Sequence, residues 1–208
     1  MRGGDLNPSD FKGLEGGAWG PRESIEHPGG GKAWLRPPAL AEIPLLHALL
    51  HAEVSRDAGT AQAMAAVFLH NSDSFWIIEH LPENGETPRL GGFYAFLLLT
   101  ADGLCALKSG TLNRTKPPLS LLTPQGARPA AIYIWAIVAR RLMRRMMPLI
   151  ARAMGAPLYA DAPIYAVVAT EDGRKAGIGT GFAASEAGSG IQLGSLMQLP
   201  PWSQGPLA

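Results

Sequence analysis

Two short stretches of the sequence carry residue types that suit anion binding. The first is GIGTGF (residues 177–182), which follows Arg174 and Lys175 and repeats glycine at every second position. Glycine lets backbone N–H groups approach an anion closely, but it also commonly ends helices. The second is ARRLMRR (residues 139–145), whose arginines carry forked donors that match phosphate. Each stretch has a structural alternative: a helix terminus for the first, and the solvated face of an amphipathic helix for the second.

Few other side chains suggest chemistry by their type and spacing. His47 and His51 have the i, i+4 spacing of helical metal ligands, but the run HALLH lacks the glutamate of a zinc-protease helix. We interpret both as structural histidines of a helix, and we expect no metal site. Cys105 is the single cysteine and has apolar neighbours, so we expect it to be a small core residue rather than a nucleophile.

The composition is that of a mostly globular chain. It has 208 residues, of which 47% are hydrophobic and 17% charged, and this length suffices for one sizeable core. The formal net charge of +1 argues against a general nucleic-acid-binding protein. The longest apolar runs are shorter than the roughly 20 residues that cross a bilayer, and a signal-peptide pattern is missing. We therefore expect a cytoplasmic protein whose partners are neither nucleic acid nor membrane.

Glycine, proline and periodicity divide the chain into three parts. Residues 1–37 are crowded with glycine and proline and lack sustained periodicity, which predicts a disordered or loosely packed arm. Residues 38–195 carry helical and strand patterns and form the predicted domain. Residues 196–208 are predicted to be a flexible tail. A homodimer is compatible with this organisation.

Within the domain, the patterns predict two helices, then strands, then an alternation of both. One helix of about four turns starts at Pro38, and Asp57 is predicted to cap a second that ends near His70. Apolar and β-branched runs then predict strands over residues 74–80, 90–100, 104–112, 130–139 and 163–169. Thr-Ala-Asp-Gly is the predicted hairpin turn between the second and the third of these strands.

The remaining patterns complete a mixed fold. Residues 140–154 predict a helix that is either kinked at Pro148 or preceded by an arginine-rich loop. A last helix is predicted from Thr170, and a weak β segment lies near residues 191–199. The strand, helix and strand of residues 130–169 form a βαβ unit, whose two strands should be parallel. The predicted fold class is α/β (α+β): a mixed, mostly antiparallel central sheet with flanking helices.

This order of elements resembles that of the GCN5-related N-acetyltransferase (GNAT) superfamily over roughly residues 38–195. The phrases that carry the resemblance are GGFYAFLLLTADGLCALKSGTL as a central hairpin, AAIYIWAIVA and PIYAVVA as the fourth and fifth strands, and TEDGRKAGIGTGF as the last long helix. In that family Gly-Phe, here Gly181 and Phe182, closes the last helix. The resemblance implies transfer of an acyl group from acyl-CoA to an amine.

The resemblance also implies where acyl-CoA would bind. In the family the fourth and fifth strands splay apart, and their unpaired backbone groups bond to the pantetheine arm. Its pyrophosphate sits at the start of the following helix. Carried over, the implied cofactor-binding residues are Trp135, Ile137, Val138 and Ala139 for the arm, and Arg140, Arg141, Arg144 and Arg145 for the pyrophosphate.

The sequence departs from the family at the phosphate loop. The family motif Gln/Arg-x-x-Gly-x-Gly/Ala is absent from ARRLMRR, so arginine side chains would have to replace a glycine cradle. The motif does occur at residues 174–179, but only 29 residues follow Gly179 in the 208-residue chain. The missing strand and helices do not fit into that length, which favours a helix terminus for GIGTGF.

Catalytic candidates follow from the needs of amine acylation, which are a base for the ammonium and an acid for the leaving thiolate. Glu79 at the end of the first strand is a candidate base, and Tyr165 on the fifth strand a candidate acid. A surface carboxylate and a core aromatic are the structural alternatives. The tyrosine that the family often places four residues before Gly-Phe would fall at Gly177.

Three functional hypotheses follow. The first is an acyl-CoA-dependent N-acyltransferase, with acetyl-CoA or another acyl-CoA as cosubstrate and an unidentified amine as acceptor. The second is a catalytically inactive GNAT-like domain that binds CoA or a protein. The third is a nucleotide-binding βαβ domain that uses GIGTG, which the position of that run near residue 208 disfavours.

Overall fold

The computed structural model describes residues 24–26, 30–53, 59–84, 87–139, 158–168, 171–179, 181–185 and 194–201. In this part of the chain, eight strands form one sheet in the order β1-β2-β3-β4-β5-β6-β8-β7. Only β5 and β6 are parallel neighbours there, as predicted for the βαβ unit, and the other neighbours are antiparallel. The strands are β1 (Ser24–Glu26), β2 (Lys32–Arg36), β3 (Phe75–Leu81), β4 (Arg89–Leu99), β5 (Ala131–Ala139), β6 (Ile164–Val167), β7 (Ala183–Ala184) and β8 (Leu196–Leu199).

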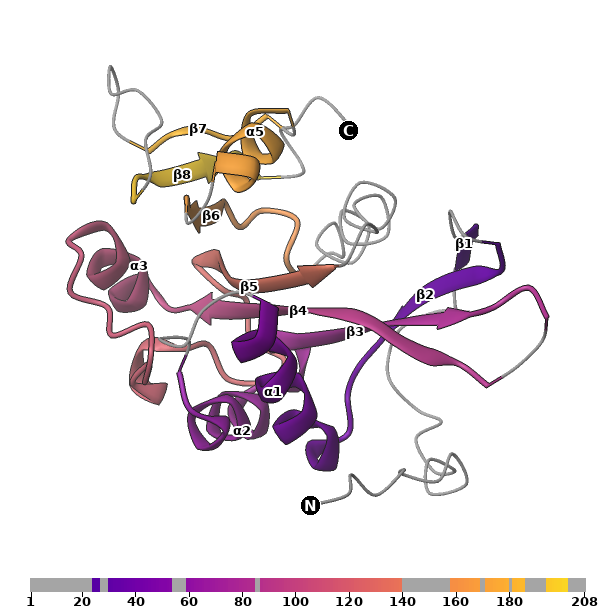
Figure 1. Cartoon of the computed structure of the whole chain (residues 1–208). Coiled ribbons are helices and arrows are strands. Elements are labelled where there is room, and N and C mark those ends of the chain that lie inside the picture. The colour runs from indigo at the N-terminus through magenta and orange to yellow at the C-terminus, as the bar shows by residue number, and fades with distance from the viewer. Residues whose placement is uncertain are drawn as a thin grey trace.

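Helices flank this sheet, which confirms the predicted fold class (Figure 1). The α-helices are α1 (Ile43–Glu53), α2 (Ala61–His70), α3 (Ala101–Lys108) and α5 (Glu171–Gly179), and the short 3-10 helices are η2 (Leu40–Glu42), η3 (Ser72–Ser74) and η4 (Leu119–Leu121). Buried residues of α1, α2 and α3 pack with one face of the sheet, hereafter the helix face. The opposite face packs with Tyr159, Ala162, Phe182 and Met197.

The central strand β4 explains why two layers form. Its residues from Phe93 to Leu99 are all buried, and alternate side chains enter the two layers because the strand period is two. Phe93, Ala95, Leu97 and Leu99 lie in the helix-face layer, whereas Tyr94, Phe96 and Leu98 lie in the other. A continuous apolar run therefore makes β4 the core of the domain.

The predicted hairpin after β4 is wrong. Residues 101–108 form α3 instead of a returning strand, and β4 pairs with β5. Cys105, which was predicted to be a core residue, is exposed on this helix. Thr100 is the N-cap, and its Oγ1 accepts the Gly103 N–H at 3.1 Å. Thr-Ala-Asp-Gly is thus a helix start with an acidic first turn. Only glycine fits at Gly103, because a Cβ there would lie 2.2 Å from the Leu121 carbonyl oxygen.

Two further boundaries differ from the prediction. Thr60, not Asp57, caps α2 by accepting the Ala63 N–H, and Asp57 lies outside the described residues. At the ends of the domain, the sheet includes segments that the sequence assigned to the arm and the tail. Strand β2 pairs with β3 along five registered residues, and β8 pairs with β6. The weak β segment predicted near residues 191–199 is confirmed by β8.

The run GIGTGF begins in the last turn of α5, which ends at Gly179. The Phe182 N–H donates to the Gly177 carbonyl at 3.0 Å and the Gly181 N–H to the Ile178 carbonyl at 3.1 Å, with Gly181 at φ +92°. These bonds form a Schellman motif, and Phe182 is buried. The C-terminal end of a helix carries a partial negative charge, which disfavours anions. The prediction of a helix terminus is confirmed.

Candidate functional site

The parallel strands β5 and β6 pair only where both begin. Ile132 is registered with Ile164 and Tyr133 with Tyr165, and the Ile132 N–H donates to the Pro163 carbonyl at 2.9 Å. Beyond Tyr133, residues 134–139 of β5 have no registered partner on this side within the described part of the chain. Strand β6 meanwhile stays paired with β8 up to Val167. The two strands therefore diverge and leave a backbone edge of β5 to which a ligand can bond.

Side-chain contacts hold the start of β6 close to the sheet. The Tyr159 hydroxyl donates to the Asp73 carboxylate of η3, and the Gln125 amide donates to the same oxygen at 3.1 Å. The Ala162 N–H bonds back to the Tyr159 carbonyl in a turn just before β6. Burial, together with the Asp73 hydrogen bond, raises the pKa of Tyr159 above its usual value, so the hydroxyl remains a donor. The junction is thus fixed at its paired end.

A β-bulge in β5 turns Trp135 toward the helix face. Ala136 pairs with Ala95 of β4, and Ile134 pairs with the next residue, Phe96. Trp135, which lies between them, therefore has no partner residue on β4. Trp135 and Ala136 consequently both face the helix-face layer, whereas the residues on either side alternate. The Trp135 indole N–H donates to the Arg114 carbonyl at 2.7 Å. The bulge therefore links the diverging strand to the loop after α3.

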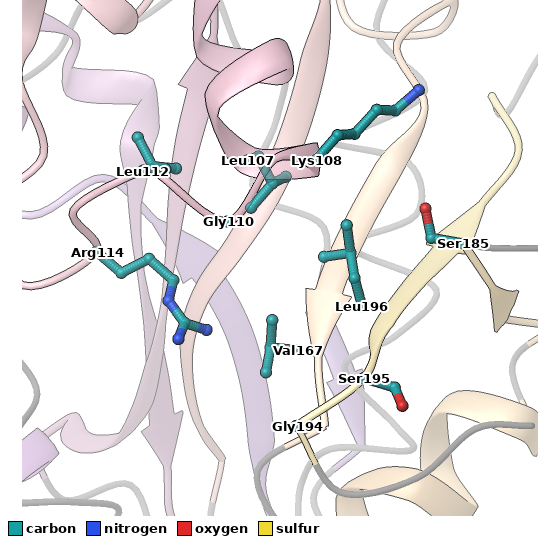
Figure 2. Close-up of a pocket in the computed structure, with 10 residues that line it drawn as sticks. All are labelled: Leu107, Lys108, Gly110, Leu112, Arg114, Val167, Ser185, Gly194, Ser195 and Leu196. Carbon is teal, nitrogen blue, oxygen red and sulfur yellow. The ribbon is translucent and has the colours of Figure 1, made fainter. Parts of the chain in front are cut away.

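A pocket of about 460 Å³ lies beside the junction, on the helix face (Figure 2). Its walls are the end of α3 with the following loop, Val167 of β6, and Leu196 of β8. Tyr133 and Tyr165, the last registered pair, contact the two cationic side chains of its described lining. Arg114 Nη1 lies 3.5 Å from the Tyr133 hydroxyl oxygen, and Lys108 Nζ lies 5.7 Å from the centre of the Tyr165 ring.

The sequence-predicted residues are only partly brought together. Tyr165 is on β6 at the junction and is 1% exposed. Trp135, Ile137, Val138 and Ala139 all lie on the part of β5 without a registered partner toward β6. Val138 faces the helix-face layer and Ile137 the opposite one. Arg140, Arg141, Arg144 and Arg145 lie outside the described residues. Binding of acyl-CoA by these residues stays a prediction.

Glu79 lies apart from Tyr165, because β4 and β5 separate its strand β3 from β6. Its Oε1 accepts from Arg36 Nε at 2.6 Å and its Oε2 from the Trp34 indole at 2.9 Å. Arg36 also bonds to Glu42 through both Nη atoms, at 2.8 and 2.7 Å. Glu79 thus belongs to an ion-pair cluster that joins β2, β3 and η2.

The pKa shifts of Glu42 and Arg36 follow from their burial and their mutual hydrogen bonds. Burial by itself raises the pKa of the Glu42 carboxyl, but hydrogen bonds from Arg36 and the Ala39 N–H outweigh it and hold the pKa below its usual range. Burial lowers the pKa of Arg36, and the bonds to Glu42 and Glu79 more than offset this, so its pKa is raised. The cluster is a partly buried structural network.

Sequence reasoning missed Tyr133, Arg114 and Lys108. Tyr133 follows an isoleucine on β5 as Tyr165 does on β6, and this repeated Ile-Tyr pair was the available signal. The positions of Lys108 and Arg114 could not be predicted, because residues 104–112 were expected to form the second strand of a hairpin. The helix α3 and its loop are what bring both cations to the junction.

The described histidines make structural contacts. His47 Nε2 lies 3.2 Å and His51 Nε2 3.5 Å from the Gly59 carbonyl oxygen, and the two ring centres are 4.3 Å apart. Across the described ranges, three or more histidine, cysteine, aspartate or glutamate side chains are nowhere grouped to hold a metal ion. None of the helices described here is long and apolar enough to span a membrane.

Comparisons with known proteins show the fold alone. No protein-family model and no curated protein sequence matches the chain. Among solved structures, the diaminobutyrate acetyltransferase of Paenibacillus lautus, in complex with L-2,4-diaminobutyric acid and coenzyme A, is 11% identical with a TM-score of 0.50. The match covers 83% of this chain and 97% of that one. An uncharacterized protein of Bacillus halodurans is 12% identical, with a TM-score of 0.46, over 88% of this chain and 93% of its own. The first match supports a GNAT-like fold.

Proposed function

We propose that this protein is an acyl-CoA-dependent N-acyltransferase, most simply an acetyltransferase, in which an amine attacks the thioester directly. The observation that carries the proposal is the divergence of β5 and β6 after the Tyr133 and Tyr165 pair. The GNAT-like fold supports it, and the similar diaminobutyrate acetyltransferase binds coenzyme A and an amine substrate. That divergence is also the feature which the resemblance to the family predicts.

The unpaired edge of β5 fits the cosubstrate chemically. The pantetheine arm of coenzyme A contains amide groups, which can pair with a strand edge as an added strand does. Residues 134–139 offer about 20 Å of such an edge at the usual rise of roughly 3.3 Å per residue. Ile137, Val138 and Ala139 would hold the arm, and the arginines from Arg140 to Arg145 would meet the pyrophosphate.

The reaction needs two proton transfers. A deprotonated amine nitrogen attacks the thioester carbonyl, the new C–N bond forms as the C–S bond breaks, and the amine proton leaves to a base or water. The departing thiolate then takes up one proton. Tyr165 is the better placed of the two catalytic candidates, because it lies where the strands diverge. Glu79 is held by Arg36 and Trp34 on another strand.

Thermal unfolding with and without millimolar acetyl-CoA tests the binding half of the proposal. We expect acetyl-CoA to raise the Tm, because a ligand that binds only the folded state stabilises it. Replacing Arg140 and Arg141 by alanine should abolish this shift, whereas Arg128→Ala, which changes an exposed arginine paired with Asp161, should preserve it. If acetyl-CoA does not raise the Tm of the wild-type protein, the proposal is wrong.

Thiol release from acetyl-CoA with an amine panel tests turnover. Release that depends on the amine and yields the N-acetyl product by mass spectrometry would support the enzyme. The second hypothesis, a CoA-binding domain without catalysis, is favoured by Gly177. This residue occupies the position of the family tyrosine, and it packs where a Cβ would lie 2.8 Å from the Met197 methyl carbon. A raised Tm without thiol release across the panel would support that alternative.

A further inference from the structure

Among the described residues that line the pocket beside the β5 and β6 junction, two carry a positive charge and none carries a negative one. The two are Lys108 and Arg114, and this described lining contains neither aspartate nor glutamate. Figure 2 shows Arg114 extending from the loop after α3 toward Val167, with Leu196 on the neighbouring strand. The described lining therefore combines apolar side chains, such as Val167 and Leu196, with two cationic ones.

The contacts of these two cations supply no compensating charge. Arg114 bonds to the neutral Tyr133 hydroxyl at 3.5 Å, which is the weak limit of a hydrogen bond, and Lys108 lies over the Tyr165 ring. Both side chains are exposed. In contrast, Arg36, Arg128 and Arg174 each pair with a carboxylate in the described structure. A concave site with uncompensated charge of one sign attracts a ligand of the other sign.

The position of the pocket indicates which substrate would bring that anion. The pocket touches the paired end of β5 through the Tyr133 and Arg114 contact. The residues predicted to meet the cosubstrate pyrophosphate follow Ala139, six residues farther along the strand and roughly 20 Å away at about 3.3 Å per residue. One diphosphate cannot reach both ends of the strand while its thioester lies between them. The anion in the pocket then belongs to the acceptor.

We infer that this pocket holds the carboxylate of a free amino acid, whose amine is presented to the junction between β5 and β6. The inference rests on the proposed function and names its acceptor class. Arginine binds a carboxylate through two parallel N–H donors, and lysine adds a point charge. The volume of about 460 Å³ suits a small metabolite. Leu107, Val167 and Leu196 provide apolar surface for the carbon chain.

The test pairs each amino acid of a panel with the amine that remains when its carboxylate is removed, for example L-lysine with 1,5-diaminopentane and L-ornithine with 1,4-diaminobutane. Thiol release from acetyl-CoA gives kcat/KM for each member. We expect at least one amino acid to exceed its paired amine at least tenfold. Arg114→Gln should lower kcat/KM for that amino acid at least tenfold, mainly through KM, and change the value for the paired amine less than twofold.

Two further variants sharpen this test. Lys116→Gln removes the same charge from the same loop, but Lys116 does not line the pocket, so both values should stay within twofold of wild type. Arg114→Lys keeps the charge and should restore part of the preference. The inference is overturned if wild type uses both members of every pair equally, or if Arg114→Gln lowers both values alike. In that case the acyltransferase function still stands, because turnover has been observed.

A binding measurement separates the inference from the proposed function. If no amine in the panel releases thiol, the enzyme proposal fails, and the inference is decided by thermal shifts with the same pairs. An amino acid that raises the Tm of wild type and of Lys116→Gln, but not of Arg114→Gln, supports the carboxylate site. The inference is wrong if no amino acid raises the Tm at concentrations up to about 10 mM. This is about ten times the upper end of ordinary KM values, roughly 1 mM.

Discussion

The two edges of β5 differ in how far they are paired. Toward β4 the strand is registered along eight residue pairs, from Ala131 to Ala139 with one bulge. Toward β6 the described register contains two pairs. One edge therefore completes the core of the sheet, and the other is the edge proposed to bind the cosubstrate. A single strand thus separates the fully paired part of the sheet from the proposed binding part.

The reason for this difference lies in the neighbours of β5. Strand β4 is apolar and buried over seven consecutive residues, Phe93 to Leu99, so its pairing with β5 encloses both core layers. Strand β6 is four residues long, and β8 binds its other edge along its full length. The Val168 N–H continues this pairing by donating to the Ser195 carbonyl. Because Tyr159 fixes only the start of β6, the strand follows β8 away from β5.

The largest expected effect on stability belongs to the closed edge. Leu97→Ala removes a fully buried side chain from the apolar half of β4 and should lower the free energy of unfolding by about 3 kcal/mol or more. Leu196→Ala is the matched change at the pocket, where the leucine is only half-buried, and should cost about 1 kcal/mol. Urea denaturation measures both. Equal losses would contradict the division of the molecule into a stabilising and a binding part.

A pair of tyrosine substitutions compares the two edges by activity. Tyr165→Phe removes the proposed acid at the open junction and should lower kcat about 100-fold, the lower end of general acid catalysis. Tyr94→Phe is the control in the closed region, where the described structure gives the buried Tyr94 hydroxyl no hydrogen-bond partner. It should leave kcat unchanged and raise the free energy of unfolding by about 1 kcal/mol. A Tyr165→Phe enzyme with wild-type kcat would remove Tyr165 from the mechanism.

The predictability of each region from sequence follows the same division. The strands from Phe75 to Leu99 and from Ala131 to Ala139 are long apolar runs, and local composition was enough to place them. The parallel pairing of β5 and β6 followed from their connection. The helix α3 was mistaken for a strand, because Leu104 to Leu107 is apolar as a returning strand would be, and the capping role of Thr100 was read as a turn.

The candidate site was less predictable than the sheet. Tyr165 and the residues after Trp135 were found through their place on two strands, which the family resemblance supplied. Lys108 and Arg114 come from a segment whose position depends on how α3 packs, and such tertiary contacts leave no local pattern in the sequence. Glu79 was placed on the correct strand, but its partners Arg36 and Trp34 lie in a segment that was assigned to the arm.

The ion-pair cluster on β2 and β3 predicts a pH dependence of stability in the closed region. The pKa of Glu42 is lowered in the folded protein, so its contribution to stability is fully present above the ordinary pKa of an unfolded glutamate, about 4.5. It is lost as the pH falls through the lower, folded pKa. At pH 7, Glu42→Gln should cost about 2 kcal/mol, the usual range for a hydrogen bond to a charged group.

Denaturation at several pH values tests this sign. The difference in unfolding free energy between wild type and Glu42→Gln should shrink as the pH falls from 5 toward about 3, since protonated Glu42 resembles glutamine. Glu83→Gln, which changes an exposed glutamate in the turn after β3, is the control and should give a difference near zero at every pH. A difference for Glu42→Gln that grows on acidification would show that this carboxylate does not stabilise the fold.

The smallest expected effect comes from the glycines at the end of α5, beside the open part of the sheet. Gly181 has φ +92°, where any Cβ is strained, so Gly181→Ala should lower the free energy of unfolding by about 1 kcal/mol. Gly179 is helical and a Cβ there meets nothing within 4 Å, so Gly179→Ala should raise the free energy by up to about 1 kcal/mol. Opposite signs at two glycines of one run would identify GIGTGF as a helix terminus in solution. If instead both substitutions left stability unchanged and abolished the thermal shift with acetyl-CoA, the glycines would bind phosphate, and the binding edge would have to be moved from β5 to α5.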